Sequence, residues 1–115
     1  MRNTQELYDS VIDRFSSVRV LVVGDVMMDR FQYGKVERIS PEAPVPVFRP
    51  ARIVEMPGGV GNTAVNLTSL GCKVHLVART GADKTAKRLA GILKDGNVDV
   101  DFFHQENCGT VTLLY

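Results

Sequence analysis

Two aspartates follow a short apolar run near the start of the chain. Val20 to Val23 is continuous and apolar, as a central parallel strand requires, and Asp25 and Asp29 come soon after it. Ligands of open α/β sheets bind at the carboxyl ends of the strands, where a carboxylate can accept charge-assisted hydrogen bonds from two sugar hydroxyls. Asp25 is interpreted as a cap on the turn rather than as a ligand. The alternative for Asp29 is a surface ion pair with Arg30 or Arg38.

A glycine-rich segment, Pro57-Gly58-Gly59-Val60-Gly61-Asn62, precedes a stretch with helical spacing. Glycines at a helix start let a ligand approach the backbone closely, and the free N–H groups there favour anionic or oxygen-rich ligands. Asn62 adds hydrogen-bond donors and an acceptor, which suits a sugar diol. The segment is therefore a second candidate binding element. The alternative is an ordinary tight turn in which Asn62 caps the helix.

Established phosphate-binding motifs do not fit the sequence. Gly58, Gly59 and Gly61 lack the GxGxxG spacing of a dinucleotide-binding loop, and we expect no strand directly before them. The P-loop pattern, GxxxxGK followed by Ser or Thr, does not occur. The turn from Thr80 to Asp83 resembles a catalytic glycine-alanine-glycine-aspartate turn but lacks one glycine of the anion hole. Asp83 is therefore interpreted as a helix N-cap.

The composition narrows the class of protein. The chain has 115 residues, of which 44% are hydrophobic, and this fits one small folded unit. Its net charge of +1 provides no electrostatic basis for binding nucleic acid or an anionic membrane. No apolar run approaches the ~20 residues of a membrane span, and no secretion signal is visible, so we expect a cytoplasmic protein.

Cys72 and Cys108 are expected to be free thiols. His75 and His104 lack metal-ligand partners at useful spacing.

The apolar periodicity predicts an α/β protein with a parallel sheet. We expect helices over residues 4 to 15, from Val60 to before Gly71, and from Asp83 to before Gly96. Strands are expected over 20 to 23, 74 to 78, 98 to 102 and 110 to 115. The stretch from about 31 to 57 holds all five prolines, so its two expected strands, 31 to 36 and 45 to 56, are edge-like. This stretch is interpreted as a small β lid inserted between core elements.

Three segments together resemble the ribokinase (phosphofructokinase-B) family of sugar kinases, and within it the heptose-7-phosphate kinase domains. They are Val20 to Arg30, Arg38 to Val47, and Pro57 to Gly59 with Asn62. The resemblance covers nearly all of residues 1–115 and implies the N-terminal portion of a ribokinase-like fold, a parallel sheet flanked by helices. It also implies that Asp29, Gly59 and Asn62 contact the sugar. Gly58, in the same loop, is a further substrate-binding candidate.

The activity that the resemblance implies is transfer of the ATP γ-phosphoryl group, with Mg²⁺, to the anomeric hydroxyl of a heptose 7-phosphate. The product would enter ADP-heptose and lipopolysaccharide core synthesis. A lid of this kind covers the sugar in related kinases and often pairs with a second subunit, so a homodimer is implied as well. Val60 and Ala86 depart from the residues that the family prefers at their positions.

The length of the chain leaves two interpretations of its function. A ribokinase-like domain has roughly 300 residues, and the resemblance places its catalytic base, its anion hole and most of its ATP site beyond Tyr115. We therefore expect a fragment or a truncated reading frame with no catalytic residue and no kinase activity of its own. The alternative is a non-catalytic sugar-binding or lid-mediated dimerisation module.

Overall fold

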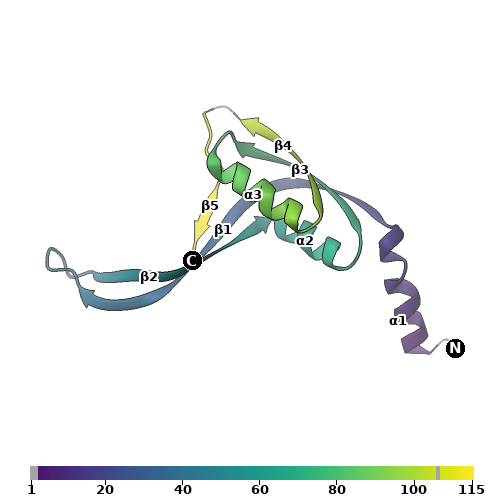
Figure 1. Ribbon diagram of the computed structural model, residues 1–115, viewed down its shortest axis with the longest axis horizontal. Coiled ribbons are helices and arrows are strands. Elements are labelled where there is room, and N and C mark those ends of the chain that lie inside the picture. Colours follow the sequence, from purple (N-terminus) through teal and green to yellow (C-terminus); the bar gives the residue numbers. More distant parts are fainter. Residues whose placement is uncertain (1–2, 106) are drawn as a thin grey trace.

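A computed structural model describes residues 3–105 and 107–115 of the chain (Figure 1). The elements follow one another as α1 (Thr4–Ile12), a 3-10 turn (Phe15–Ser17), β1 (Arg19–Ile39), β2 (Pro46–Gly59), α2 (Val60–Ser69), β3 (Lys73–Gly81), α3 (Lys84–Asp95), β4 (Val98–Gln105) and β5 (Thr112–Leu114). All the predicted helices and strands are present. The first helix is shorter than expected, because the chain turns to 3-10 geometry at Phe15.

The strands form one sheet in the order β2-β1-β3-β4, with β5 pairing to β1. β1, β3 and β4 are mutually parallel, and this confirms the predicted parallel α/β sheet. β2 runs antiparallel to β1, as a hairpin partner must. The carboxyl ends of the parallel strands therefore meet at the edge from which the β1–β2 hairpin extends.

One face of the sheet carries the hydrophobic core. The largest fully buried side chains come from β1, β3 and α3, namely Met28, Leu76, Leu89 and Leu93. α2 and α3 both pack on this face, whereas Leu21 and Val23 on the opposite face of β1 are 65% and 66% exposed. The expectation that β1 is buried on both faces is therefore wrong for the described residues, because both core-packing helices lie on the same side.

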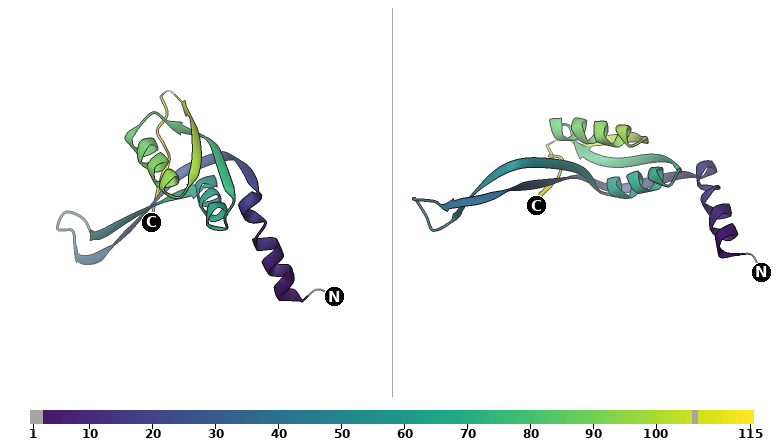
Figure 2. Two further views of the ribbon diagram at one scale, coloured as in Figure 1. Left: turned by 45° about the vertical axis from the view of Figure 1, so that its right-hand side comes forward. Right: turned by 60° about the horizontal axis from the view of Figure 1, so that its bottom comes forward.

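The lid is a two-stranded ribbon that extends from the body on the side opposite α1 (Figures 1 and 2). It confirms the two predicted edge-like strands, but β1 runs without a break from Arg19 to Ile39, so the sheet strand and the first lid strand are one. β2 also continues to Gly59, and α2 begins at Val60. The expectation that no strand directly precedes the glycine loop is therefore wrong. The glycine spacing alone still separates the loop from a dinucleotide fingerprint.

Asp83 caps α3, as predicted, and also holds the segment that follows β4. Its Oδ1 accepts a hydrogen bond from the Ala86 N–H at 2.8 Å. The same carboxylate accepts from the N–H and the hydroxyl of Thr110, at 2.7 and 2.8 Å. These bonds, from the Thr110 backbone first, lower the pKa of Asp83. The cap thus fixes the approach of β5 to β1.

His75 lies between two carboxylates on the open face of the sheet. The parallel register places Asp99 of β4 beside His75 of β3. Nδ1 lies 2.8 Å from Asp99 Oδ2, and Nε2 lies 3.0 Å from Asp101 Oδ2. The Asp99 carboxylate, followed by that of Asp101, raises the pKa of His75 above its ordinary value of 6.5. The imidazolium form therefore ties β3 to β4.

We predict that this tie makes the stability of the chain depend on pH. Because the pKa of His75 is higher in the folded chain, the stabilisation is complete below pH 6.5 and is lost as pH rises through the raised pKa. Urea unfolding of the wild type and His75→Gln over a pH series should give a difference that shrinks in this direction. Asp99→Asn should lower the His75 pKa, measured by NMR, more than Asp101→Asn does. A difference between wild type and His75→Gln that stays constant with pH would contradict the assignment.

Candidate functional site

The carboxylate of Asp29 lies against the backbone of Gly58. Asp29 is on β1 and Gly58 is on β2, where Met56 faces Asp29 and Met27 faces Gly58 in the antiparallel register. A Cβ built on Gly58 would lie 2.5 Å from Asp29 Oδ1 and 2.6 Å from Oδ2. Only glycine leaves room for the carboxylate here. Two of the predicted site residues are thus brought together.

Asp29 Oδ1 is buried and has no hydrogen-bond partner among the described residues. Buried polar atoms are almost always paired, and an unpaired one costs roughly 1–3 kcal/mol, more when it is charged. The predicted alternative, a surface ion pair with Arg30 or Arg38, is not formed, since Arg30 binds Glu55 instead. The position of Asp29 is therefore not explained by the contacts of the described residues alone.

Gly59 occupies the N-cap position of α2 with a backbone that glycine alone adopts readily. Its φ is 58° and its ψ is −134°. A Cβ at this position would also lie 2.5 Å from the carbonyl oxygen of Asp25. Gly59 therefore turns the chain from β2 into α2 directly beside the end of the sheet part of β1.

Asn62 lies in the first turn of α2, and its side chain is exposed. Its predicted alternative role, capping the helix, is not seen, because Gly59 holds the N-cap position. No hydrogen bond joins Asn62 to Asp29 in the described part of the chain. Contact between Asn62 and a sugar thus stays a prediction.

A hollow of about 330 Å³ opens at the carboxyl ends of β3 and β4, beside the point where β1 leaves its pairing with β3. The strand topology predicts a ligand site at this edge. The hollow is lined by Asp25, Val26, Met27, Arg79, Thr80, Gln105, Cys108, Gly109, Thr110 and Val111. Asp25, which was interpreted as a turn cap, makes no side-chain hydrogen bond within 3–105 and 107–115 and lies on its rim. The sequence reasoning missed Arg79. Arg79 could have been found from its position near the carboxyl end of the predicted strand. In the structure, the register of β1 and β3 places Arg79 beside Asp25.

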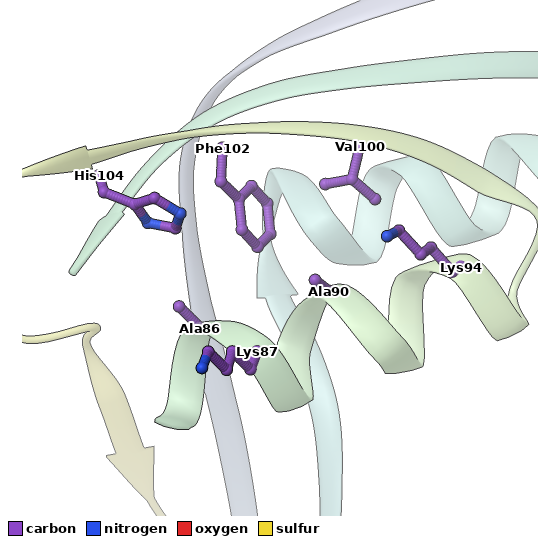
Figure 3. A pocket seen from close by; sticks show the side chains of 7 residues that line it. All are labelled: Ala86, Lys87, Ala90, Lys94, Val100, Phe102 and His104. Atoms are coloured by element: carbon purple, nitrogen blue, oxygen red, sulfur yellow. The ribbon is translucent and has the colours of Figure 1, made fainter. Parts of the chain in front are cut away.

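A second hollow, of about 180 Å³, lies between α3 and β4 (Figure 3). Its floor is apolar, with Val100 and Phe102, and Lys87, Lys94 and His104 stand around it. His104 Nδ1 lies 3.2 Å from the Thr80 hydroxyl, within hydrogen-bond distance of β3. Asp29, Gly58, Gly59 and Asn62 line neither hollow, whereas Asp25 lines the one at the carboxyl-end edge. Because ligands of open α/β sheets bind at this edge, it is the better candidate site.

Comparisons with known proteins identify the family. Residues 18–114 match the family model described as pfkB family carbohydrate kinase. Bifunctional protein HldE of Shigella dysenteriae serotype 1 is 48% identical over 103 residues, which are 90% of this chain and 22% of that protein. This chain thus spans about a fifth of the length of that relative.

Solved structures share the fold. A carbohydrate kinase from Agrobacterium tumefaciens superposes with a TM-score of 0.66 at 26% identity, over 84% of this chain and 30% of that one. A fructokinase from Xylella fastidiosa with bound ATP gives a TM-score of 0.63 at 21% identity, over 84% of this chain and 28% of that one, and so shows the fold alone. The chain has the N-terminal architecture of a ribokinase-like fold, and it belongs to the pfkB family of carbohydrate kinases.

Proposed function

We propose that this chain is the N-terminal, sugar-binding part of an ATP-dependent kinase that phosphorylates the anomeric hydroxyl of a heptose 7-phosphate. The identity with bifunctional HldE proteins, 48% over 103 residues, supports this choice among the sugars that the family phosphorylates. The proposed product would serve ADP-heptose and lipopolysaccharide core synthesis, which places the protein in the cytoplasm.

The observation that carries the proposal is the packing of the Asp29 carboxylate against Gly58, with one carboxylate oxygen unpaired among the described residues. Sugar hydroxyls are hydrogen-bond donors, and a carboxylate is an acceptor with room for several of them. A bound sugar would therefore provide the donors that the described residues do not. Gly59 and Asn62, at the entrance of α2, are proposed to orient the same sugar from its other side.

We propose that ATP and Mg²⁺ bind to the remainder of a full-length kinase and to no residue of this chain. Phosphoryl transfer needs a base, charge stabilisation and a nucleotide cradle. The carboxylate that most resembles a catalytic base by sequence, Asp83, already accepts three hydrogen bonds from Ala86 and Thr110. Its lowered pKa makes it a still weaker base.

The chain alone should therefore show no kinase activity. ADP formation from ATP, Mg²⁺ and heptose 7-phosphate should not rise above the rate without protein, while a full-length kinase carrying the same segment should turn over. ADP formation proportional to the concentration of the pure chain would overturn this division of roles.

In a full-length kinase carrying this segment, Asp29→Asn should raise KM for heptose 7-phosphate by about 10- to 100-fold, as expected for losing hydrogen bonds to a charged acceptor. Gly58→Ala should act in the same direction, since its Cβ would displace the Asp29 carboxylate. Gly91→Ala is the matched control, because a Cβ there meets nothing within 4 Å. Circular dichroism would verify folding. Unchanged kinetics in both Asp29→Asn and Gly58→Ala would remove this pair from the site.

A second proposed role is self-association through the lid. Val36, Ile39, Val45 and Ile53 are apolar and between 53% and 69% exposed on the ribbon. Exposed apolar side chains on a two-stranded ribbon favour an interface. This role is compatible with the sugar site and also describes the alternative, a non-catalytic module.

Sedimentation velocity should then show a dimer of the chain that Ile39→Lys converts to monomer, because a buried lysine opposes the interface. Leu21→Lys is the control, since Leu21 is 65% exposed on the sheet face, close to the 69% of Ile39. A monomeric wild type, or a dimer that only Leu21→Lys disrupts, would show that the lid is not the interface.

A further inference from the structure

One carboxylate joins the lid to the body of the molecule. Glu55 Oε1 accepts from Arg30 Nη2 at 2.7 Å and from Arg30 Nε at 2.8 Å. Its other oxygen, Oε2, pairs with the guanidinium of Arg88. The side chain of Glu55 is only 11% exposed. Both of its oxygens are thus used, by two arginines from different parts of the fold.

The three residues come from three elements. Arg30 and Glu55 face each other in the register of β1 and β2, at the base of the lid. Arg88 lies on α3, whose Leu89 is fully buried in the core. Within residues 3–105 and 107–115, this is the one ion pair that connects a lid strand to a helix. We call these three residues the lid clamp.

The other ion pair of the lid differs in position and environment. Arg49 Nε lies 3.5 Å from Glu37 Oε2, and the two side chains are 70% and 53% exposed. Exposed pairs contribute little, and this one joins β1 to β2 without reaching the body. A shielded carboxylate with two guanidinium partners is held more firmly, since removing one partner leaves charge poorly compensated. Of the two ion pairs of the lid, the lid clamp is therefore the one that reaches α3.

The lid clamp is adjacent in sequence to residues of the candidate sugar site. Arg30 directly follows Asp29, and Glu55 directly precedes Met56, the residue opposite Asp29. β2 then continues to Gly58, on which the Asp29 carboxylate lies. A rotation of the lid at Arg30 and Glu55 would therefore move Asp29 relative to the body. α2, which bears Asn62, would stay in place.

We propose that Glu55 and Arg88 are positioning residues that set the angle of the lid and thereby hold Asp29 in register with the rest of the sugar site. The part of this inference that concerns the sugar rests on the proposed function. The part that concerns the lid angle rests on the contacts alone. Neither residue is proposed to touch the substrate.

The lid angle can be measured without activity. Spin labels at Glu42→Cys, at the lid tip, and at Gly91→Cys, on an open surface of α3, report the distance between lid and body in a Cys108→Ser background. The distance distribution should broaden in Arg88→Ala and in Glu55→Gln. It should stay unchanged in Lys87→Ala, which removes the neighbouring charge of α3, and in Glu37→Gln, which breaks the exposed lid pair. A distribution unaffected by both Arg88→Ala and Glu55→Gln would overturn the inference.

The functional consequence is measured in a full-length kinase carrying this segment. Arg88→Ala should raise KM for heptose 7-phosphate on the order of ten-fold, with little change in kcat, and Arg88→Lys should restore part of the loss. A broadened distance distribution between lid and body, together with an unchanged KM, would refute the positioning role. If Asp29→Asn has no effect either, the sugar site itself fails. The spin-label distances still decide whether the clamp sets the lid angle.

Discussion

A single strand, β1, belongs to both the body and the lid, and the site depends on this continuity. Arg19 to Asp25 pair with β3, and Val26 onward pair with β2. The strand passes close to the start of α2 at Gly24, where a Cβ would lie 2.7 Å from Val60 Cγ1. Any larger residue would push β1 away from α2. Gly24 therefore sets how closely β1 approaches the start of α2.

The features that depend on near neighbours in the chain could be predicted from the sequence. The helices follow from apolar spacing, and the cap of α3 follows from Asp83 ahead of that spacing. The prolines between 41 and 57 correctly indicated edge-like strands. The motif likeness suggested Asp29 and Gly58 separately as binding candidates, and the packing of the Asp29 carboxylate against Gly58 is seen only in the structure.

Features that depend on register could not be predicted, because a shift of one residue changes every partner. Glu55 meets Arg30 only through the pairing of β1 with β2, and it meets Arg88 only through the packing of α3. His75 gains its two carboxylates in the same way from β4. The exposure of Leu21 was also out of reach, since apolarity does not tell which helices cover which face. The predicted contact of Asn62 with a sugar stays a prediction, because its exposed side chain has no hydrogen-bond partner in the described residues.

The two thiols differ in their environment, and this has a practical consequence. Cys72 is 8% exposed within the core, whereas Cys108 is exposed near the carboxyl-end hollow. Thiol reagents attack accessible cysteines far faster than buried ones. A native sample should consequently consume one equivalent of reagent quickly and a second only as the interior opens. The reaction rate of Cys72, followed by mass spectrometry, thus measures how often the folded core opens, without any added label.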